Sequence, residues 1–77
     1  MDIKEVKRLI QKARKLSEQK SIVTLEIFNI LEKSGIDLEN KSNADNADDL
    51  EQAITCYIDY NEYNIKSIIE EIKSQLN

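Results

Sequence analysis

The chain has 77 residues, with 11 Lys and Arg against 15 Asp and Glu, so its net charge is −4 at neutral pH. A chain this short supports only one hydrophobic core, and we expect residues 1–77 to form a single domain. The sequence has no histidine and one cysteine, Cys56, which excludes the usual zinc ligand sets and any Cys–His or Ser–His catalytic pair. We therefore expect a protein that is not an enzyme and that needs no metal ion or cofactor.

The absence of proline and the presence of one glycine, Gly35, favour helix along most of the chain. Apolar runs are far shorter than the roughly 20 residues of a membrane span, and the N-terminus lacks the apolar segment of a secretory signal. These features predict a cytoplasmic protein that does not bind membranes. Frequent Ile, Lys and Asn with little Arg favour a bacterial or phage gene.

The first predicted helix runs from Asp2 to about Gln19. Its apolar residues recur every three or four positions, as on one face of a helix: Ile3, Val6, Leu9, Ile10, Ala13 and Leu16. The second helix is predicted to begin near Ser21 or Thr24, although residues 21–24 also suit a short extended segment. Its apolar residues point in almost every direction, which predicts a buried central helix.

The second helix is predicted to end at Ser34 and Gly35, with Gly35 in the left-handed conformation and Ile36 and Leu38 folding back onto the last turn. The polar residues 37–49 predict the main loop. Asp48 followed by Glu51 resembles a capping box at the start of the third helix. The predicted buried face of that helix consists of Leu50, Ala53, Ile54, Tyr57 and Ile58.

Residues 59–64 predict a corner, because Asp and Asn cap and turn better than they propagate a helix. A final helix follows, with an apolar stripe of Ile65, Ile68, Ile69, Ile72 and Leu76. The alternative is that the last two helices merge into one bent helix. The pattern as a whole predicts an all-α fold, a small antiparallel bundle of about four helices, or three if the last two merge. The chain is expected to be a monomer or a helical homodimer, because isoleucine stripes on so small a chain favour pairing.

The first candidate site is the acidic segment that carries the tyrosines. Tyrosine is common at interface hot spots, and nearby carboxylates attract a basic partner. The candidate partner-binding residues are Tyr57, Tyr60, Tyr63, Asp59 and Glu62. This pattern favours a protein that binds another protein, as an inhibitor, immunity-type or adaptor module. The competing interpretation is structural, with Tyr57 in the core, the other two tyrosines at the corner and the acids capping helices.

Small acidic four-helix immunity proteins of the DNase-colicin type are similar in size and charge and also place tyrosines beside acids. Their paired tyrosines followed by proline are absent here, where the stretch reads Cys56-Tyr57-Ile58-Asp59-Tyr60. The resemblance is therefore general and implies no membership. Acyl carrier proteins are similar in length and acidity, but no serine here follows an aspartate.

The second candidate site is the polar side of the first helix. Residues 1–20 contain seven Lys and Arg and three Asp and Glu, whereas the remaining residues contain four and twelve. The candidate basic face consists of Lys4, Lys7, Arg8, Lys12 and Lys15. It suits a nucleic-acid-associated regulator, which is the alternative function, although an acidic domain with a pI near 4.8 is unusual in that class. The competing interpretation is a solvated outer helix face.

Overall fold

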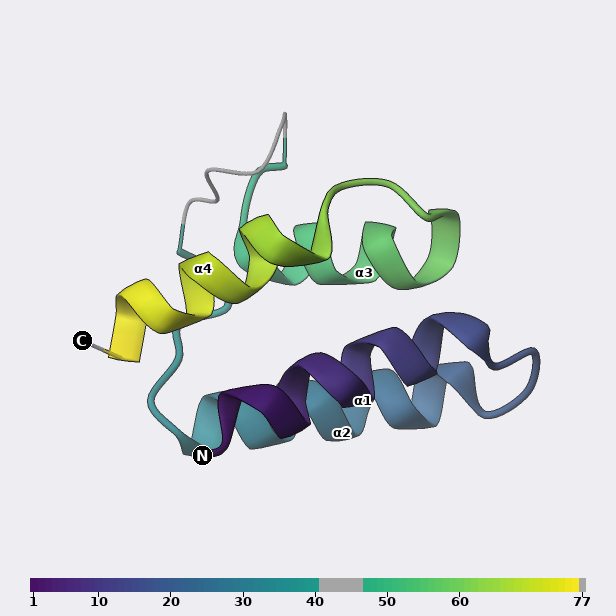
Figure 1. The fold of residues 1–77 in the computed structure, drawn as a ribbon, viewed down its shortest axis with the longest axis horizontal. Coiled ribbons are helices and arrows are strands. Elements are labelled where there is room, and N and C mark those ends of the chain that lie inside the picture. The colour runs from purple at the N-terminus through teal and green to yellow at the C-terminus, as the bar shows by residue number, and fades with distance from the viewer. Residues whose placement is uncertain (41–46, 77) are drawn as a thin grey trace.

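The computed structural model describes residues 1–40 and 47–76. They form four helices and no strand: α1 (Ile3–Lys15), α2 (Lys20–Lys33), α3 (Leu50–Tyr60) and α4 (Ile65–Leu76). Figure 1 shows two antiparallel hairpins, α1 with α2 and α3 with α4, stacked on each other. The radius of gyration is 11.2 Å. The predicted all-α bundle of four helices is confirmed, and the alternative with merged last helices is wrong.

The helix α1 begins where the sequence predicts, because the Asp2 carboxylate caps it by accepting a 2.9 Å hydrogen bond from the Lys4 backbone N–H. It ends at Lys15, four residues before the predicted end. Leu16 is already extended, with ψ of 136°, and Gln19 takes the left-handed conformation that starts α2. The apolar stripe places Val6, Ile10 and Ala13 in the core, as predicted.

The prediction that the second helix is the buried central one is wrong. α2 contacts α1 and α3 but not α4 among the described residues, and only Ile27 and Leu31 are buried on it. Ile22 and Leu25 are 57% and 66% exposed. A helix with apolar residues on all sides still buries only the side that faces its neighbours, and α2 has neighbours on one side.

The start of α2 also differs from the prediction. Lys20 is its first residue, so residues 21–24 are helical rather than extended. Thr24 lies inside the helix, where its hydroxyl donates a 2.8 Å bond to the Lys20 carbonyl, and no side chain caps this end. The left-handed Gln19 (φ 60°) starts the helix by backbone geometry alone.

The end of α2 agrees with the prediction. Gly35 adopts a φ of 86°, and the N–H of Ile36 donates to the Leu31 carbonyl over 3.0 Å, which forms a Schellman motif. Ile36 and Leu38 are buried, so they do fold back onto the bundle. The loop prediction for residues 37–49 falls partly on residues 41–46, which lie outside the described residues.

The capping box of α3 is one residue later than predicted. The carboxylate of Asp49, rather than that of Asp48, accepts the backbone N–H of Gln52 over 2.8 Å, and the Gln52 side chain in turn accepts the N–H of Asp48. Asp49 has the extended backbone that an N-cap requires. The box therefore pairs Asp49 with Gln52 instead of Asp48 with Glu51.

The core lies between the two hairpins and draws on all four helices. Among its largest fully buried side chains are Ile10, Ile27, Leu31, Leu50, Ile54, Ile58, Ile68 and Ile72. α1 contacts each of the other three helices, and so does α3. These two helices are the central ones of the bundle.

Candidate functional site

The candidate site is the corner that joins α3 to α4. α3 ends at Asn61, whose φ of 56° is left-handed and whose N–H donates to the Tyr57 carbonyl over 3.2 Å. The N–H of Glu62 donates to the Cys56 carbonyl, also over 3.2 Å. Asn64 starts α4, because its side-chain oxygen accepts the N–H of Lys66 over 2.8 Å. The corner is thus closed at both ends by hydrogen bonds.

The structure separates the three candidate tyrosines by burial. Tyr60 is 71% exposed on the last turn of α3, whereas Tyr57, one turn earlier, is 5% exposed and belongs to the core. Tyr63 is half-buried against the core. Only Tyr60 presents most of its ring to a partner at the corner.

The candidate carboxylates Asp59 and Glu62 are exposed beside Tyr60. Their charges reach the half-buried thiol of Cys56: burial raises the pKa of Cys56 most, and Glu62 and then Asp59 raise it further. Asp59, Tyr60 and Glu62 are thus exposed residues at the end of α3 and just after it, and we call them the acidic corner. Tyr57 is left outside it.

The backbone of the corner is strained at Tyr63. Its φ of 67° is left-handed, a conformation that bulky side chains adopt rarely and that costs about 1–3 kcal/mol. The half-buried ring and the bonds around Asn61 and Asn64 hold it there. No sequence signal marks this strain, because tyrosine does not favour a left-handed turn.

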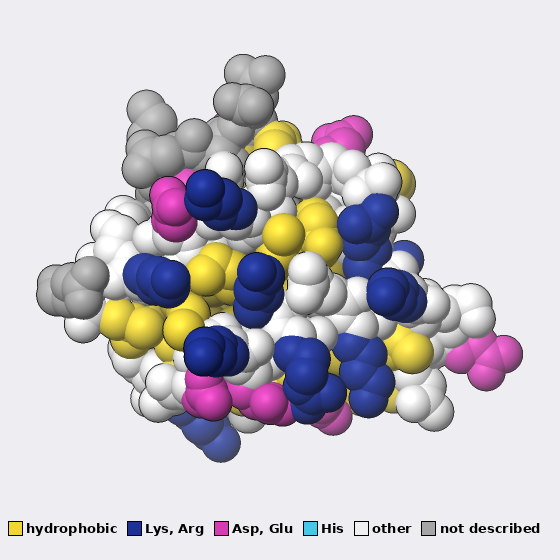
Figure 2. Space-filling model, in the orientation of Figure 1, with side chains coloured by type: hydrophobic (Ala, Val, Ile, Leu, Met, Phe, Trp, Pro, Cys, Tyr) yellow, Lys and Arg dark blue, Asp and Glu magenta, His cyan; other side chains and the backbone are white. Residues whose placement is uncertain are grey.

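The candidate basic residues Lys4, Lys7, Arg8, Lys12 and Lys15 are all exposed on α1. Arg8 pairs with Glu5, whose carboxylate accepts from its guanidinium; that hydrogen bond lowers the pKa of Glu5 and raises that of Arg8. In Figure 2, Lys and Arg side chains are spread over the face formed by α1 and α4, with hydrophobic side chains between them and Asp and Glu side chains along the lower edge. Lys66 and Lys73, on α4, are exposed as well.

Arg14 is a candidate binding residue that the sequence analysis does not identify. Its guanidinium carbon lies 5.2 Å from the centre of the Tyr57 ring, and its Nη1 donates to the Tyr57 hydroxyl over 3.4 Å. Its spacing of three and seven residues from Gln11 and Lys7 places the three on one flank of α1. The contact with Tyr57, 43 residues later, has no sequence signal.

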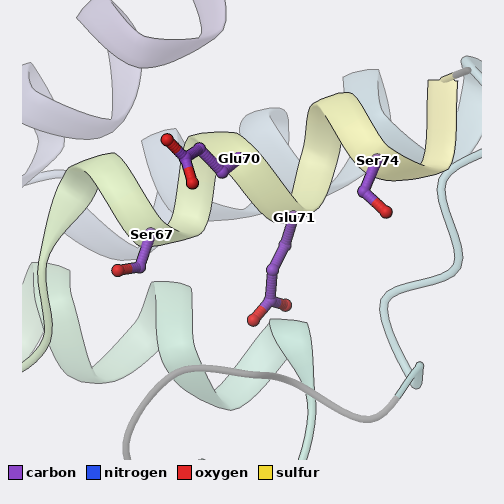
Figure 3. Close-up of a pocket in the computed structure, with 4 residues that line it drawn as sticks. All are labelled: Ser67, Glu70, Glu71 and Ser74. Atoms are coloured by element: carbon purple, nitrogen blue, oxygen red, sulfur yellow. The ribbon is translucent and has the colours of Figure 1, made fainter.

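A surface pocket on α4 carries two adjacent carboxylates. Ser67, Glu70, Glu71 and Ser74 line a hollow of about 280 Å³. Figure 3 shows the Glu70 and Glu71 side chains leaving α4 in different directions, Glu71 toward α3. The two carboxylates therefore do not meet at a common point, as expected for neighbours about 100° apart on a helix.

Across residues 1–40 and 47–76, no group of three or more Cys, Asp or Glu side chains is placed to hold a metal ion. Nor does this part of the chain include a helix with the length and apolar character needed to cross a membrane. Comparison of the chain with protein-family models, with curated proteins and with solved structures gives no match. The function must therefore be argued from the geometry of its surfaces.

Proposed function

We propose that this protein is a non-enzymatic binding module that recognises a basic protein partner through the acidic corner, Asp59, Tyr60 and Glu62. The observation that carries the proposal is the 71% exposure of Tyr60, the highest among the large apolar side chains of the described residues. A large ring left in water between two carboxylates adds nothing to the core. Buried by a partner, the same ring supplies apolar contact, and its hydroxyl supplies a hydrogen bond.

The charges of the corner support a basic partner. Neither Asp59 nor Glu62 forms an ion pair with a cation among the described residues. Both raise the pKa of Cys56, so their negative potential extends to the helix surface beside them. Uncompensated carboxylates around an aromatic anchor speed association with a positively charged surface.

The fixed shape of the corner also supports recognition. The caps at Asn61 and Asn64 and the half-buried ring of Tyr63 hold the segment between α3 and α4 in one conformation. A surface that is already ordered loses less conformational entropy when it binds. We attribute the strained backbone at Tyr63 to this role, since strain tends to persist where function requires a particular geometry.

A binding role without catalysis is supported by the types of residue present. The sequence contains no histidine, and the one thiol, Cys56, has a raised pKa that keeps it protonated at neutral pH. The exposed groups of the corner are two carboxylates and a phenol. They suit contact with another protein surface better than activation of a small substrate.

The test is capture of partners from the lysate of the source cells with three baits: the unchanged protein, Y60A and L25A. Leu25 is 66% exposed on α2, so L25A removes a similarly exposed apolar side chain away from the corner. We expect Y60A to weaken binding of the captured partner by about tenfold or more, since hot-spot residues contribute roughly 2 kcal/mol or more. L25A should bind as the unchanged protein does. Equal binding by Y60A and the unchanged protein, with both folded by circular dichroism, contradicts the proposal.

The carboxylates are tested by kinetics with the captured partner. The double variant D59N/E62Q should lower the association rate and flatten its dependence on salt, with a smaller effect on dissociation. Surface plasmon resonance at two salt concentrations measures both rates. An association rate that is unchanged at low salt would show that these charges do not steer the partner.

A further inference from the structure

The basic side of the bundle contains a pocket separate from the acidic corner. It lies between the C-terminal part of α1 and the second half of α3 and has a volume of about 430 Å³. Its lining residues are Gln11, Arg14, Lys15 and Tyr57, none of which is acidic. Two cations, an amide and a phenol offer many hydrogen-bond donors, so the lining suits an anionic ligand.

Arg14 is the best-positioned donor of this pocket. Its guanidinium lies 5.2 Å from the centre of the Tyr57 ring and donates to the Tyr57 hydroxyl over 3.4 Å. Tyr57 is buried and therefore fixed, so the aromatic ring, rather than a carboxylate, holds the guanidinium in place. Among the described residues Arg14 forms no ion pair, which leaves its charge available to a ligand.

Arg8, on the same helix, provides the contrast. Both of its hydrogen bonds go to the carboxylate of Glu5, one turn earlier. A ligand at Arg8 would have to compete with an acid that is already bound. The two arginines therefore differ in how available their charge is to an anion. Arg8 is already paired with Glu5, whereas Arg14 forms no ion pair among the described residues.

The end of α1 carries the negative pole of its helix dipole, which opposes an anion. That pole is equivalent to roughly half an elementary charge. The last turn contains three cations, Lys12, Arg14 and Lys15, which exceed it severalfold. These positive charges outweigh the negative pole at this end of α1.

We propose that this pocket binds a phosphate group, with Arg14 as its principal ligand and Lys15 and Gln11 as further donors. A phosphate presents three or four oxygens and up to two negative charges, which match this donor set better than the two oxygens of a carboxylate do. The group belongs either to a free polyphosphate or to a nucleic-acid strand. Lys4 and Lys7 of α1 and Lys66 and Lys73 of α4 are exposed. Figure 2 shows Lys and Arg side chains spread over the face that α1 and α4 form, so the flanking phosphates of a strand lying across this face would meet further cations.

This inference is independent of the acidic corner, which shares no residue with the pocket. Binding is measured at low salt with two probes: inorganic pyrophosphate by calorimetry, and a fluorescein-labelled single-stranded oligonucleotide by anisotropy. The variants are R14Q and R8Q, which remove the same charge from the same helix. We expect R14Q to weaken binding by about tenfold and R8Q by less than about threefold, as for loss of one charge-assisted contact.

Equal effects of R14Q and R8Q would overturn the proposal, because binding would then follow net charge alone. Failure of both probes to bind the unchanged protein at low salt would also overturn it. If R14Q does not fold, R14K serves instead: it keeps the charge but loses the planar fork, and weaker binding than in R8Q is the expected result. Unchanged binding by R14K together with unchanged binding by K15Q would exclude the pocket.

The two sources of phosphate are separated by the α4 lysines. With a strand as the ligand, K66Q/K73Q weakens oligonucleotide binding, and the binding falls steeply as salt rises. With a free polyphosphate as the ligand, pyrophosphate binds, and the same variant leaves its affinity unchanged. A polyglutamate peptide that binds as tightly as the oligonucleotide and depends equally on Arg14 would contradict the assignment to phosphate.

Discussion

The helices α2 and α3 each contain seven apolar residues but differ in burial. α3 buries five of its 11 residues, and α2 buries two of its 14. The apolar residues of α3 recur at three- and four-residue intervals, so they form one stripe that faces α1, α2 and α4 together. Those of α2 are spread around the helix, and its partners cover one side only. Burial here follows the arrangement of apolar residues and the number of neighbouring helices rather than apolar content.

The largest expected effect comes from truncating the buried stripe of α3. I54A should lower the free energy of unfolding by about 2–5 kcal/mol, because Ile54 is fully buried and its removal leaves a cavity. L25A, on the exposed side of α2, should change it by less than about 0.5 kcal/mol. Urea denaturation followed by circular dichroism measures both. Similar losses in the two variants would mean that α2 is buried in solution, for example by a second copy of the chain.

A smaller effect is expected at the end of α2. G35A should destabilise the fold by about 1–2 kcal/mol, because the φ of 86° is unfavourable for any residue with a Cβ. No atom lies within 4 Å of a Cβ built at this position, so the loss reflects backbone conformation alone. G35N should lose less than G35A, since Asn tolerates the left-handed region better. Equal losses from the two substitutions, measured by denaturation, would point to another cause.

Removal of the N-cap side chain is expected to lower the free energy of unfolding by about 1 kcal/mol more at α3 than at α2. D49A removes the side-chain cap of α3 and should lower stability by that amount. Q19A, at the corresponding position of α2, removes no capping bond and should be close to neutral. Thermal denaturation of both variants measures the difference. A Q19A variant as unstable as D49A would show that Gln19 has a role that its hydrogen bonds do not explain.

The smallest expected effect concerns the rates at which two thiols react, that of Cys56 on α3 and that of a cysteine introduced on α2. Burial and the charges of Glu62 and Asp59 raise the pKa of Cys56, so less of it is thiolate at a given pH. Its alkylation by iodoacetamide near pH 8 should be severalfold slower than that of the thiol introduced by L25C in a C56A background. The alkylation rate of Cys56 should keep rising at higher pH values, where the alkylation rate of the L25C thiol has levelled off. A faster reaction of Cys56 would contradict the raised pKa.

Periodicity and chain-breaking residues were enough to predict the four helices, the stripes of α1 and α3 and the termination of α2 at Gly35. The stripe of α4 was predicted apart from Leu76, which is 44% exposed. These features depend on local spacing, which the sequence displays directly. The burial of α2 was mispredicted because an all-round apolar pattern has two explanations, a central helix and a peripheral helix with a free face. Only the tertiary arrangement separates them.

The candidate sites were predictable in part for the same reason. The exposed positions of Asp59, Tyr60 and Glu62 at a corner follow from the turn-forming residues around them, and the structure places them there. The core position of Tyr57 follows from its place in the α3 stripe. The stacking of Arg14 on Tyr57 depends on how α1 crosses α3, and the strain at Tyr63 depends on how the corner is anchored. Neither leaves a trace in local sequence.

One pair of hydrogen bonds joins α4 to the backbone segment that follows the first hairpin. The side chain of Gln75, in α4, accepts the N–H of Asp37 over 2.7 Å and donates to its carbonyl over 3.0 Å. The backbone just after the first hairpin is therefore fixed by a residue 38 positions later. Until α4 packs against the rest of the bundle, the backbone of Asp37 lacks this partner. A variant truncated before Gln75 would lose both bonds, and we expect proteases to cleave the segment that carries the buried Ile36 and Leu38 faster than in the unchanged protein.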